Sequence, residues 1–166
     1  MAEGKKRLYN RATANAALCN SLCRAVEVNS KTAAYPFPFY VGELAIFGSL
    51  ITSTGKVHDV DVAIQLKPCK ELDEQRKTGK FIDYLIKWEY TYFRERAERS
   101  GYVFFLPEEE TQRYIKAGKG IISFHQYDEL QLLHCPYVPL ITNGKLTPDG
   151  EAVLNAHGAD GLVCAE

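Results

Sequence analysis

The spacing of apolar residues in the first part of the chain predicts a helix. From about Leu8 to Val28, apolar positions recur at intervals of three and four, with alanines between them. This is the period of the buried face of an α-helix. An aromatic segment with two prolines follows at 35–39. Each proline disfavours the α conformation in the residue before it, so this segment is expected to be an extended connector.

Two apolar stretches then predict strands. The first, at 44–47, is continuously apolar and ends at Gly48-Ser49. The second, at 57–66, alternates strictly, with aliphatic residues on one face and Asp59, Asp61, Ala63 and Gln65 on the other. Alternation with a period of two is typical of a strand that packs one face on a core. The second stretch is therefore expected to be a strand that turns its aspartates away from the core.

Residues 71–99 predict one long helix with a wide apolar face. Two neighbouring stripes make up this face: Phe81, Leu85, Trp88 and Tyr92 form one, and Ile82, Ile86, Phe93 and Ala97 form the other. A single contact with a sheet requires a narrower face. We expect a central helix, and the alternative is a surface over 81–97 through which copies of the chain form a homo-oligomer.

The remaining segments complete the fold class. A short helix is expected at 107–117, strands at 121–125 and 137–141, and a last helix that Thr147 caps and Pro148 opens. This order predicts an α/β (α+β) domain with a small mixed sheet of about three to five strands and helices packed on it. At 166 residues, a single domain is expected over 1–166, with a core at about 8–130 and a C-terminal extension at 131–166.

Charge and hydropathy exclude some classes of function. The chain has 20 lysines and arginines against 21 aspartates and glutamates, a net charge of −1. Generic duplex DNA binding normally requires a strong positive excess, so we do not expect it. The sequence lacks an apolar run of about 18 residues, so we expect no membrane span. The polar segment after the first basic residues does not fit a secretory signal, and a cytoplasmic protein is expected.

The five cysteines add little chemistry. They form no Cys-x-x-Cys pair, although Cys19 and Cys23 are four apart and share a helix face. A redox or metal site would need further soft ligands at suitable spacing. Reduced, apolar filler residues are the simpler interpretation.

The two aspartates and the Gly-Ser turn form the candidate chemical site. Asp59 and Asp61 are two apart on the predicted strand, so their carboxylates point the same way, roughly 6–7 Å apart. A divalent cation relieves their repulsion, and Mg²⁺ is typically held by one or two carboxylates together with substrate phosphates. Gly48 lets the backbone approach a phosphate, and Ser49 can donate to its oxygens. The alternative is a plain turn followed by an edge strand with solvated aspartates.

These residues resemble a known family signature. Phe47-Gly48-Ser49, followed after nine residues by Asp59-Val60-Asp61-Val62, resembles the signature of the DNA polymerase β-type nucleotidyltransferase superfamily. The motif covers about residues 44–66. The order of elements extends the resemblance to about residue 130, as in a minimal, single-domain nucleotidyltransferase.

The resemblance implies a reaction and a role for each motif residue. Gly48 and Ser49 would bind the nucleotide, while Asp59 and Asp61 would be the catalytic residues and bind two Mg²⁺ ions together with an NTP. The implied enzyme transfers an NMP from an NTP, ATP by default, to an acceptor hydroxyl that the sequence does not identify. Pyrophosphate leaves in this in-line displacement.

One position departs from the family pattern. Active members usually carry a third carboxylate on a later strand, and the corresponding segment here is 121–129. In that segment Ser123 and His125 are expected to face the site, and neither is a carboxylate. Glu129 has the same strand parity but is better interpreted as the start of a helix. His125 fits either a base, because its ordinary pKa is near neutrality, or a core histidine.

Two other hypotheses therefore stay open. The missing third carboxylate and the apolar face at 81–97 also fit a catalytically silent module of the same fold. Such a module would be a nucleotide sensor or one component of a two-protein assembly such as a toxin–antitoxin pair. The other hypothesis is an unrelated α/β domain in which the motif occurs by chance.

Overall fold

The computed structural model describes residues 8–100 and 106–158, and within them the chain is a mixed α/β fold with seven helices and one five-stranded sheet. This confirms the predicted fold class. In chain order the elements are α1 (Arg11–Ser30), β1 (Phe39–Phe47), α2 (Ser49–Thr52), β2 (Val60–Pro68), α3 (Lys70–Lys77), α4 (Phe81–Ser100), α5 (Leu106–Lys116), β3 (Ile122–Gln126), α6 (Glu129–Leu133), β4 (Tyr137–Thr142), β5 (Lys145–Leu146) and α7 (Pro148–Gly158).

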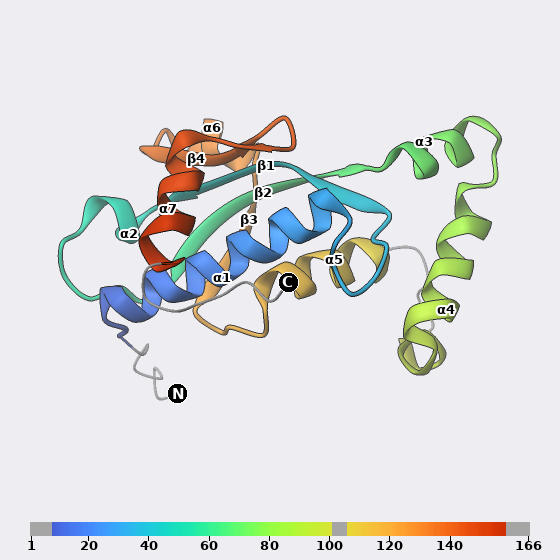
Figure 1. Ribbon diagram of the computed structural model, residues 1–166, viewed down its shortest axis with the longest axis horizontal. Helices are drawn as coiled ribbons and strands as arrows, with labels where there is room; N and C mark the ends of the chain where they lie inside the picture. The colour runs from blue at the N-terminus through green and yellow to red at the C-terminus, as the bar shows by residue number, and fades with distance from the viewer. Residues whose placement is uncertain (1–7, 101–105, 159–166) are drawn as a thin grey trace.

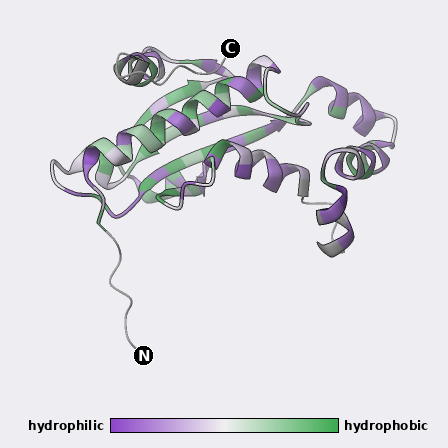
Figure 2. Ribbon diagram, turned by 60° about the horizontal axis from the view of Figure 1, so that its bottom comes forward, coloured by the Kyte–Doolittle hydropathy of each residue, from purple (hydrophilic) through white to green (hydrophobic). Residues whose placement is uncertain are grey.

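The sheet has the strand order β3-β2-β1-β4-β5. β2 and β3 are parallel, and the other neighbouring pairs are antiparallel. α1, α5 and α7 contribute buried or partly buried residues to a core on one face of this sheet, while α6 packs on the other (Figure 1). Figure 2 shows that hydrophobic residues concentrate in the strands, whereas α3 at the periphery is hydrophilic.

The predicted alternation of β2 is confirmed. Val60, Val62 and Ile64 are buried in the main core beneath α1. The opposite face of the sheet holds a smaller cluster, in which Ala63 packs with Leu130 of α6 and with two residues of β1. Asp61 of β2 therefore shares its face of the sheet with this small cluster and with the short helix α6.

The structure corrects the predicted first residue of both strands. β1 begins at Phe39, so it includes the end of the proline-rich segment. β2 begins at Val60, and Asp59 lies directly before the strand rather than inside it. The reason is that β1 ends at Phe47, whose partner is Asp61, so β1 offers no partner to the residues before Asp61. The four-residue α2 was not predicted.

The prediction of one helix over 71–99 is wrong. The segment forms two helices, and the break lies at Thr78-Gly79-Lys80, where Gly79 has a φ of +72°. A positive φ ends a right-handed helix and is readily adopted by glycine.

The expectation of a central helix is also wrong. α4 lies beyond one end of the sheet, and its main helical neighbours are α3 and α5 (Figure 1). Its aromatic face packs on the proline-rich connector: Trp88 Nε1 donates a 2.7 Å hydrogen bond to the carbonyl of Pro36, and the Trp88 ring lies 5.9 Å from that of Phe37. Ile82 and Tyr90 are exposed. The predicted homo-oligomer surface stays a prediction, and Ala97 lies outside the described side chains.

Glu89 of α4 is a buried carboxyl group with a predictable pH effect. Only 1% of its surface is exposed, and among the described residues neither of its carboxylate oxygens has a hydrogen-bond partner. Burial, and secondarily the charge of Glu110, raises the pKa of Glu89 above its ordinary value of 4.5. The folded state therefore holds this proton more tightly than the unfolded chain does, so the free energy of unfolding falls as pH rises above 4.5.

We expect Glu89→Gln to be more stable than the wild type at pH 8 and nearly equal to it at pH 4, because glutamine carries no charge to bury. Urea denaturation at both values measures this difference. Glu74→Gln serves as the control, because Glu74 is exposed. The free energy of unfolding of this variant is expected to depend on pH as that of the wild type does. A Glu89→Gln variant that is no more stable at pH 8 would contradict the prediction.

α7 packs so closely on the β4–β5 hairpin that Gly150 has no space for a side chain. A Cβ there would overlap the carbonyl oxygen of Leu140 and lie 2.9 Å from Cδ2 of Leu146. Overpacking against backbone is costly, so Gly150→Ala is expected to lower the free energy of unfolding by about 2 kcal/mol. Gly120→Ala is the matched control, since no atom of the described part of the chain lies within 4 Å of its added Cβ. Equal denaturation midpoints for the two variants would refute this expectation.

Candidate functional site

The chain makes a sharp turn at Gly48, between β1 and α2. Gly48 has a φ of +70° and a ψ of −147°, a conformation that is essentially restricted to glycine. A Cβ at this position would overlap Oδ2 of Asp61 on the neighbouring strand. The backbone of the turn can therefore lie against the Asp61 carboxylate only because position 48 has no side chain. Ser49 follows as the first residue of α2 and is half-buried.

The turn is held in place from α1. Arg11 donates hydrogen bonds to the carbonyl oxygens of Ser53 at 2.5 Å and Leu50 at 2.6 Å. Within the turn, Thr52 Oγ1 donates to the carbonyl of Gly48 at 2.9 Å. Sequence reasoning did not find Arg11, because an arginine at the start of a helix carries no signal of a distant backbone partner.

Ser123 of β3 contacts both candidate aspartates. Asp61 is the register partner of Phe47 on one side and of Ser123 on the other. Ser123 Oγ donates a 3.1 Å hydrogen bond to Oδ2 of Asp59. Asp59 is half-buried, and 20% of the Asp61 side chain is exposed. Both carboxylates therefore belong to one patch of the sheet that solvent reaches.

His125 occupies the position at which a third carboxylate was sought. It is the register partner of Ala63, and its Nε2 lies 3.3 Å from Oδ1 of Asp61. Its Nδ1 lies 3.5 Å from Oε2 of Glu129, and its ring packs edge-on against Phe47 at 5.0 Å. The imidazole thus lies between two carboxylates.

Glu129 contacts this site from an unexpected element. As the sequence indicated, it starts a helix, α6, rather than continuing β3. A tight turn at 127–128 folds that helix back, so that the carboxylate faces the imidazole four residues earlier. Strand parity had placed Glu129 on the face of His125, but the helix start expected at Glu129 argued against continuing the strand to it.

The patch fits a metal ion only in part. Among residues 8–100 and 106–158, the structure places no three or more His, Cys, Asp or Glu side chains in an arrangement that could hold a metal. Asp59 and Asp61 nevertheless fit the way proteins hold Mg²⁺, with one or two carboxylates while phosphate oxygens of the substrate fill further positions. The backbone of Gly48 lies directly against the Asp61 carboxylate, with no side chain between them.

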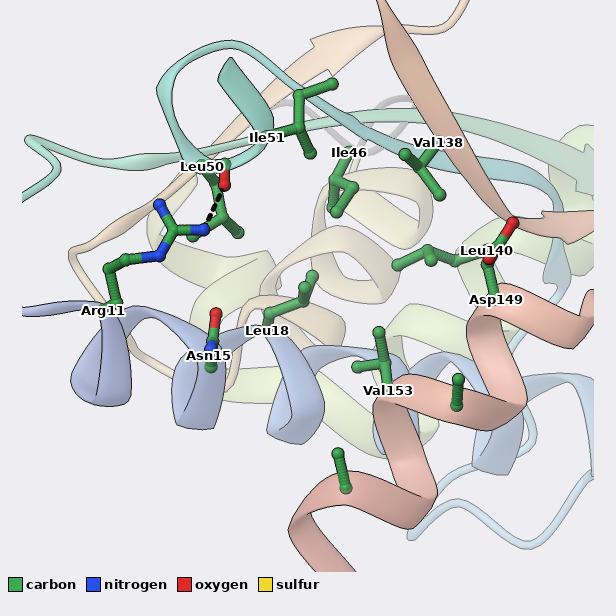
Figure 3. Close-up of a pocket in the computed structure, with 12 residues that line it drawn as sticks. Arg11, Asn15, Leu18, Ile46, Leu50, Ile51, Val138, Leu140, Asp149 and Val153 are labelled. Carbon is green, nitrogen blue, oxygen red and sulfur yellow. Dashed lines mark hydrogen bonds between the residues drawn. The ribbon is translucent and has the colours of Figure 1, made fainter. Parts of the chain in front are cut away.

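A separate cavity of about 480 Å³ lies on the opposite face of the sheet (Figure 3). Its walls come from α1, α2, α7 and two strands, and they include Arg11, Ile46, Asp149 and Val153. None of the four candidate residues lines it. Ile46 points into this cavity, whereas the next residue of β1, Phe47, packs on the face that carries the aspartates. The sheet therefore separates the cavity from the candidate site.

Other predictions concern features outside the site. None of the helices in the described ranges is long and apolar enough to cross a membrane. Cys69 and Cys135 form no disulfide with another residue of 8–100 or 106–158. Cys164 lies outside the described residues.

No protein-family model, curated protein or solved structure matches this chain. The inference of function therefore depends on the signature in the sequence and on the geometry of the residues that form it.

Proposed function

We propose that this protein is a Mg²⁺-dependent nucleotidyltransferase, which moves an NMP from an NTP to an acceptor hydroxyl. One observation carries the proposal: the turn at Gly48 has no space for a side chain because it lies against the carboxylate of Asp61. A plain turn beside a solvated edge strand gives no reason for this close approach. The signature of a hydrophobic residue, Gly-Ser, and Asp-Val-Asp-Val supports the same assignment.

Each residue of the site has a role in this proposal. Asp59 and Asp61 hold the metal ions, which neutralise the triphosphate and stabilise the attacking and leaving oxygens when bound. Gly48 admits a phosphate to the backbone, and the Ser49 hydroxyl donates to a phosphate oxygen. Ser123 fixes the orientation of Asp59 through its 3.1 Å hydrogen bond.

A silent nucleotide-binding module is the second candidate, and His125 is the observation that favours it. The site has an imidazole where active family members usually have a carboxylate to deprotonate the acceptor. A protein of this kind would bind the metal–nucleotide complex without transferring the NMP, as a sensor or as one component of a two-protein assembly. Transfer of label from an α-³²P-labelled NTP distinguishes the two candidates.

The first test is calorimetric titration with non-hydrolysable analogues of each NTP in the presence of Mg²⁺. We expect saturable binding by the wild type and none by the Asp59→Asn/Asp61→Asn double variant. Asp149→Asn is the matched control, because it removes an exposed carboxylate from the cavity on the other face. The proposal would be rejected if the wild type did not bind. It would also be rejected if the Asp149→Asn variant lost binding while the double variant kept it.

A further inference from the structure

Tyr137, the first residue of β4, is an exposed aromatic residue in line with the candidate site. It is the register partner of Phe47, which in turn is the register partner of Asp61. Register partners on neighbouring strands turn their side chains to the same face of a sheet. Tyr137 is therefore on the face that carries the aspartates, two strand spacings from Asp61, which is about 9–10 Å between the two backbones.

The next pair of residues along the same two strands shows independently which face Tyr137 is on. Ile46 and Val138 are register partners, and both line the cavity on the opposite face (Figure 3). Because side chains alternate along a strand, Phe47 and Tyr137 face the other way. Tyr127 agrees with this assignment, since it packs on the cluster that includes Phe47 and its ring also contacts that of Tyr137.

The ring of Tyr137 is supported but not covered. Its centroid lies 6.5 Å from that of Tyr127 with 75° between the ring planes, an edge-to-face arrangement that aromatic pairs prefer. Even so, 48% of Tyr137 is exposed, whereas its neighbour Phe47 is 6% exposed. A flat ligand that stacks on this ring would lose little affinity to ordering the side chain, because Tyr127 already restricts it.

We propose that Tyr137 binds the base of the nucleotide by stacking on it. This inference rests on the proposed function, because it concerns the same substrate. Gly48 and Ser49 follow β1 directly, so the phosphates would lie at the end of that strand. β1 is the strand between β2, which carries Asp61, and β4, which carries Tyr137. The sugar of a nucleoside triphosphate carries its base to one side of the phosphates, and β4 is the strand on that side.

The other side of the aspartates offers the base no comparable partner. There β3 presents Ser123 in the same row, and Ser123 is bonded to Asp59. Stacking on an aromatic ring tolerates every base, because every base has a π face, and modest preferences follow from the strength of stacking. We therefore expect all four NTPs to bind, purines more tightly than pyrimidines, since a purine overlaps more of the ring of Tyr137.

Calorimetric titration of the full chain in Mg²⁺ with two kinds of probe tests the inference. One is a non-hydrolysable analogue of each NTP, and the other is inorganic tripolyphosphate, which has no base. We expect Tyr137→Leu to bind the purine analogues about tenfold or more weakly than the wild type, because the base loses its stacking partner. Binding of tripolyphosphate is expected to be unchanged.

Two further variants separate stacking from other effects. Tyr137→Phe keeps the ring and is expected to bind both probes as the wild type does. Tyr90→Leu is the matched control, because Tyr90 belongs to α4 and is exposed to a similar extent, 46%. It is also expected to bind both probes like the wild type. Urea denaturation of each preparation shows that the variants are folded.

The outcomes distinguish this inference from the proposed function. Binding of the NTP analogues that depends on Asp59 and Asp61 but is unchanged in Tyr137→Leu would overturn the base site and leave the phosphate site standing. The base site would also be overturned if Tyr137→Leu lost affinity for tripolyphosphate to the same extent, or if Tyr137→Phe were as weak as Tyr137→Leu. A wild type that binds neither probe would overturn both proposals.

Discussion

Asp61→Asn is expected to lower the rate of NMP transfer by about 10³-fold or more while the fold stays intact. Asp61 lies against both the Gly48 turn and the His125 ring. Loss of its charge removes a ligand from the metal ion. A bound metal ion stabilises the transition state by several kcal/mol. Each 1.36 kcal/mol corresponds to a tenfold change in rate. The side chain is partly exposed, so the free energy of unfolding is expected to change by less than about 1 kcal/mol.

The measurement is transfer of label from α-³²P-labelled NTPs into RNA, protein and small-molecule fractions, with urea denaturation of the same preparations. Asp149→Asn is the control for loss of a carboxylate elsewhere, and it should transfer label at the wild-type rate. Transfer by Asp61→Asn at a rate near that of the wild type would remove Asp61 from the proposed chemistry. A wild type that binds nucleotide but transfers no label would favour the silent module.

Gly48→Ala is expected to lose nucleotide binding and to be destabilised at the same time. The conformation of Gly48 costs a residue with a side chain about 1–3 kcal/mol. The added methyl group would in addition overlap the carboxylate of Asp61, which must then move away from the turn. We therefore expect a loss of more than about 2 kcal/mol in the free energy of unfolding and no measurable binding of a metal–NTP complex.

Gly79→Ala provides the matched comparison. Gly79 also has a positive φ, of +72°, but none of the residues that the structure describes lies within 4 Å of the position of its Cβ. This variant has the cost of the backbone conformation without the overlap, and it lies far in sequence from the candidate site. Denaturation and titration of both variants test the prediction. Equal losses of stability with nucleotide binding intact in Gly48→Ala would show that the close approach to Asp61 has no role in binding.

The sequence predicted β2 well because its signal is local. Alternation of Val60, Val62 and Ile64 with polar residues has one structural solution, a strand with one buried face. The same argument placed Asp61 opposite these residues. It could not show that Gly48 would lie against Asp61, because this contact depends on where β1 ends in its pairing with β2.

The helix over 71–99 shows where periodicity fails. Its aromatic residues were interpreted as the face of a central helix, but Trp88 packs on Phe37 and hydrogen-bonds to Pro36, about fifty residues earlier in the chain. Periodicity reports that a face is apolar and not what covers it. The break at Gly79 was missed because a single glycine in a polar segment is a weak signal of a helix end.

The third position of the site was ambiguous for a similar reason. Strand parity brought both His125 and Glu129 to the face of Asp61, but the helix start recognised at Glu129 argued against extending the strand to that residue. The turn between β3 and α6 then returns Glu129 to the imidazole. Contacts that form across a change from strand to helix do not follow the period of either element, so they escape pattern analysis.

The central claim is that the Gly48 turn and the two aspartates bind one metal–triphosphate complex. A crystal structure with Mn²⁺ and a non-hydrolysable NTP analogue tests it most directly, since anomalous scattering locates the ion. We predict Mn²⁺ about 2.1 Å from oxygens of both Asp59 and Asp61, with the triphosphate against Gly48 and Ser49. A nucleotide bound instead in the cavity beside Arg11 and Asp149, on the other face of the sheet, would contradict the claim.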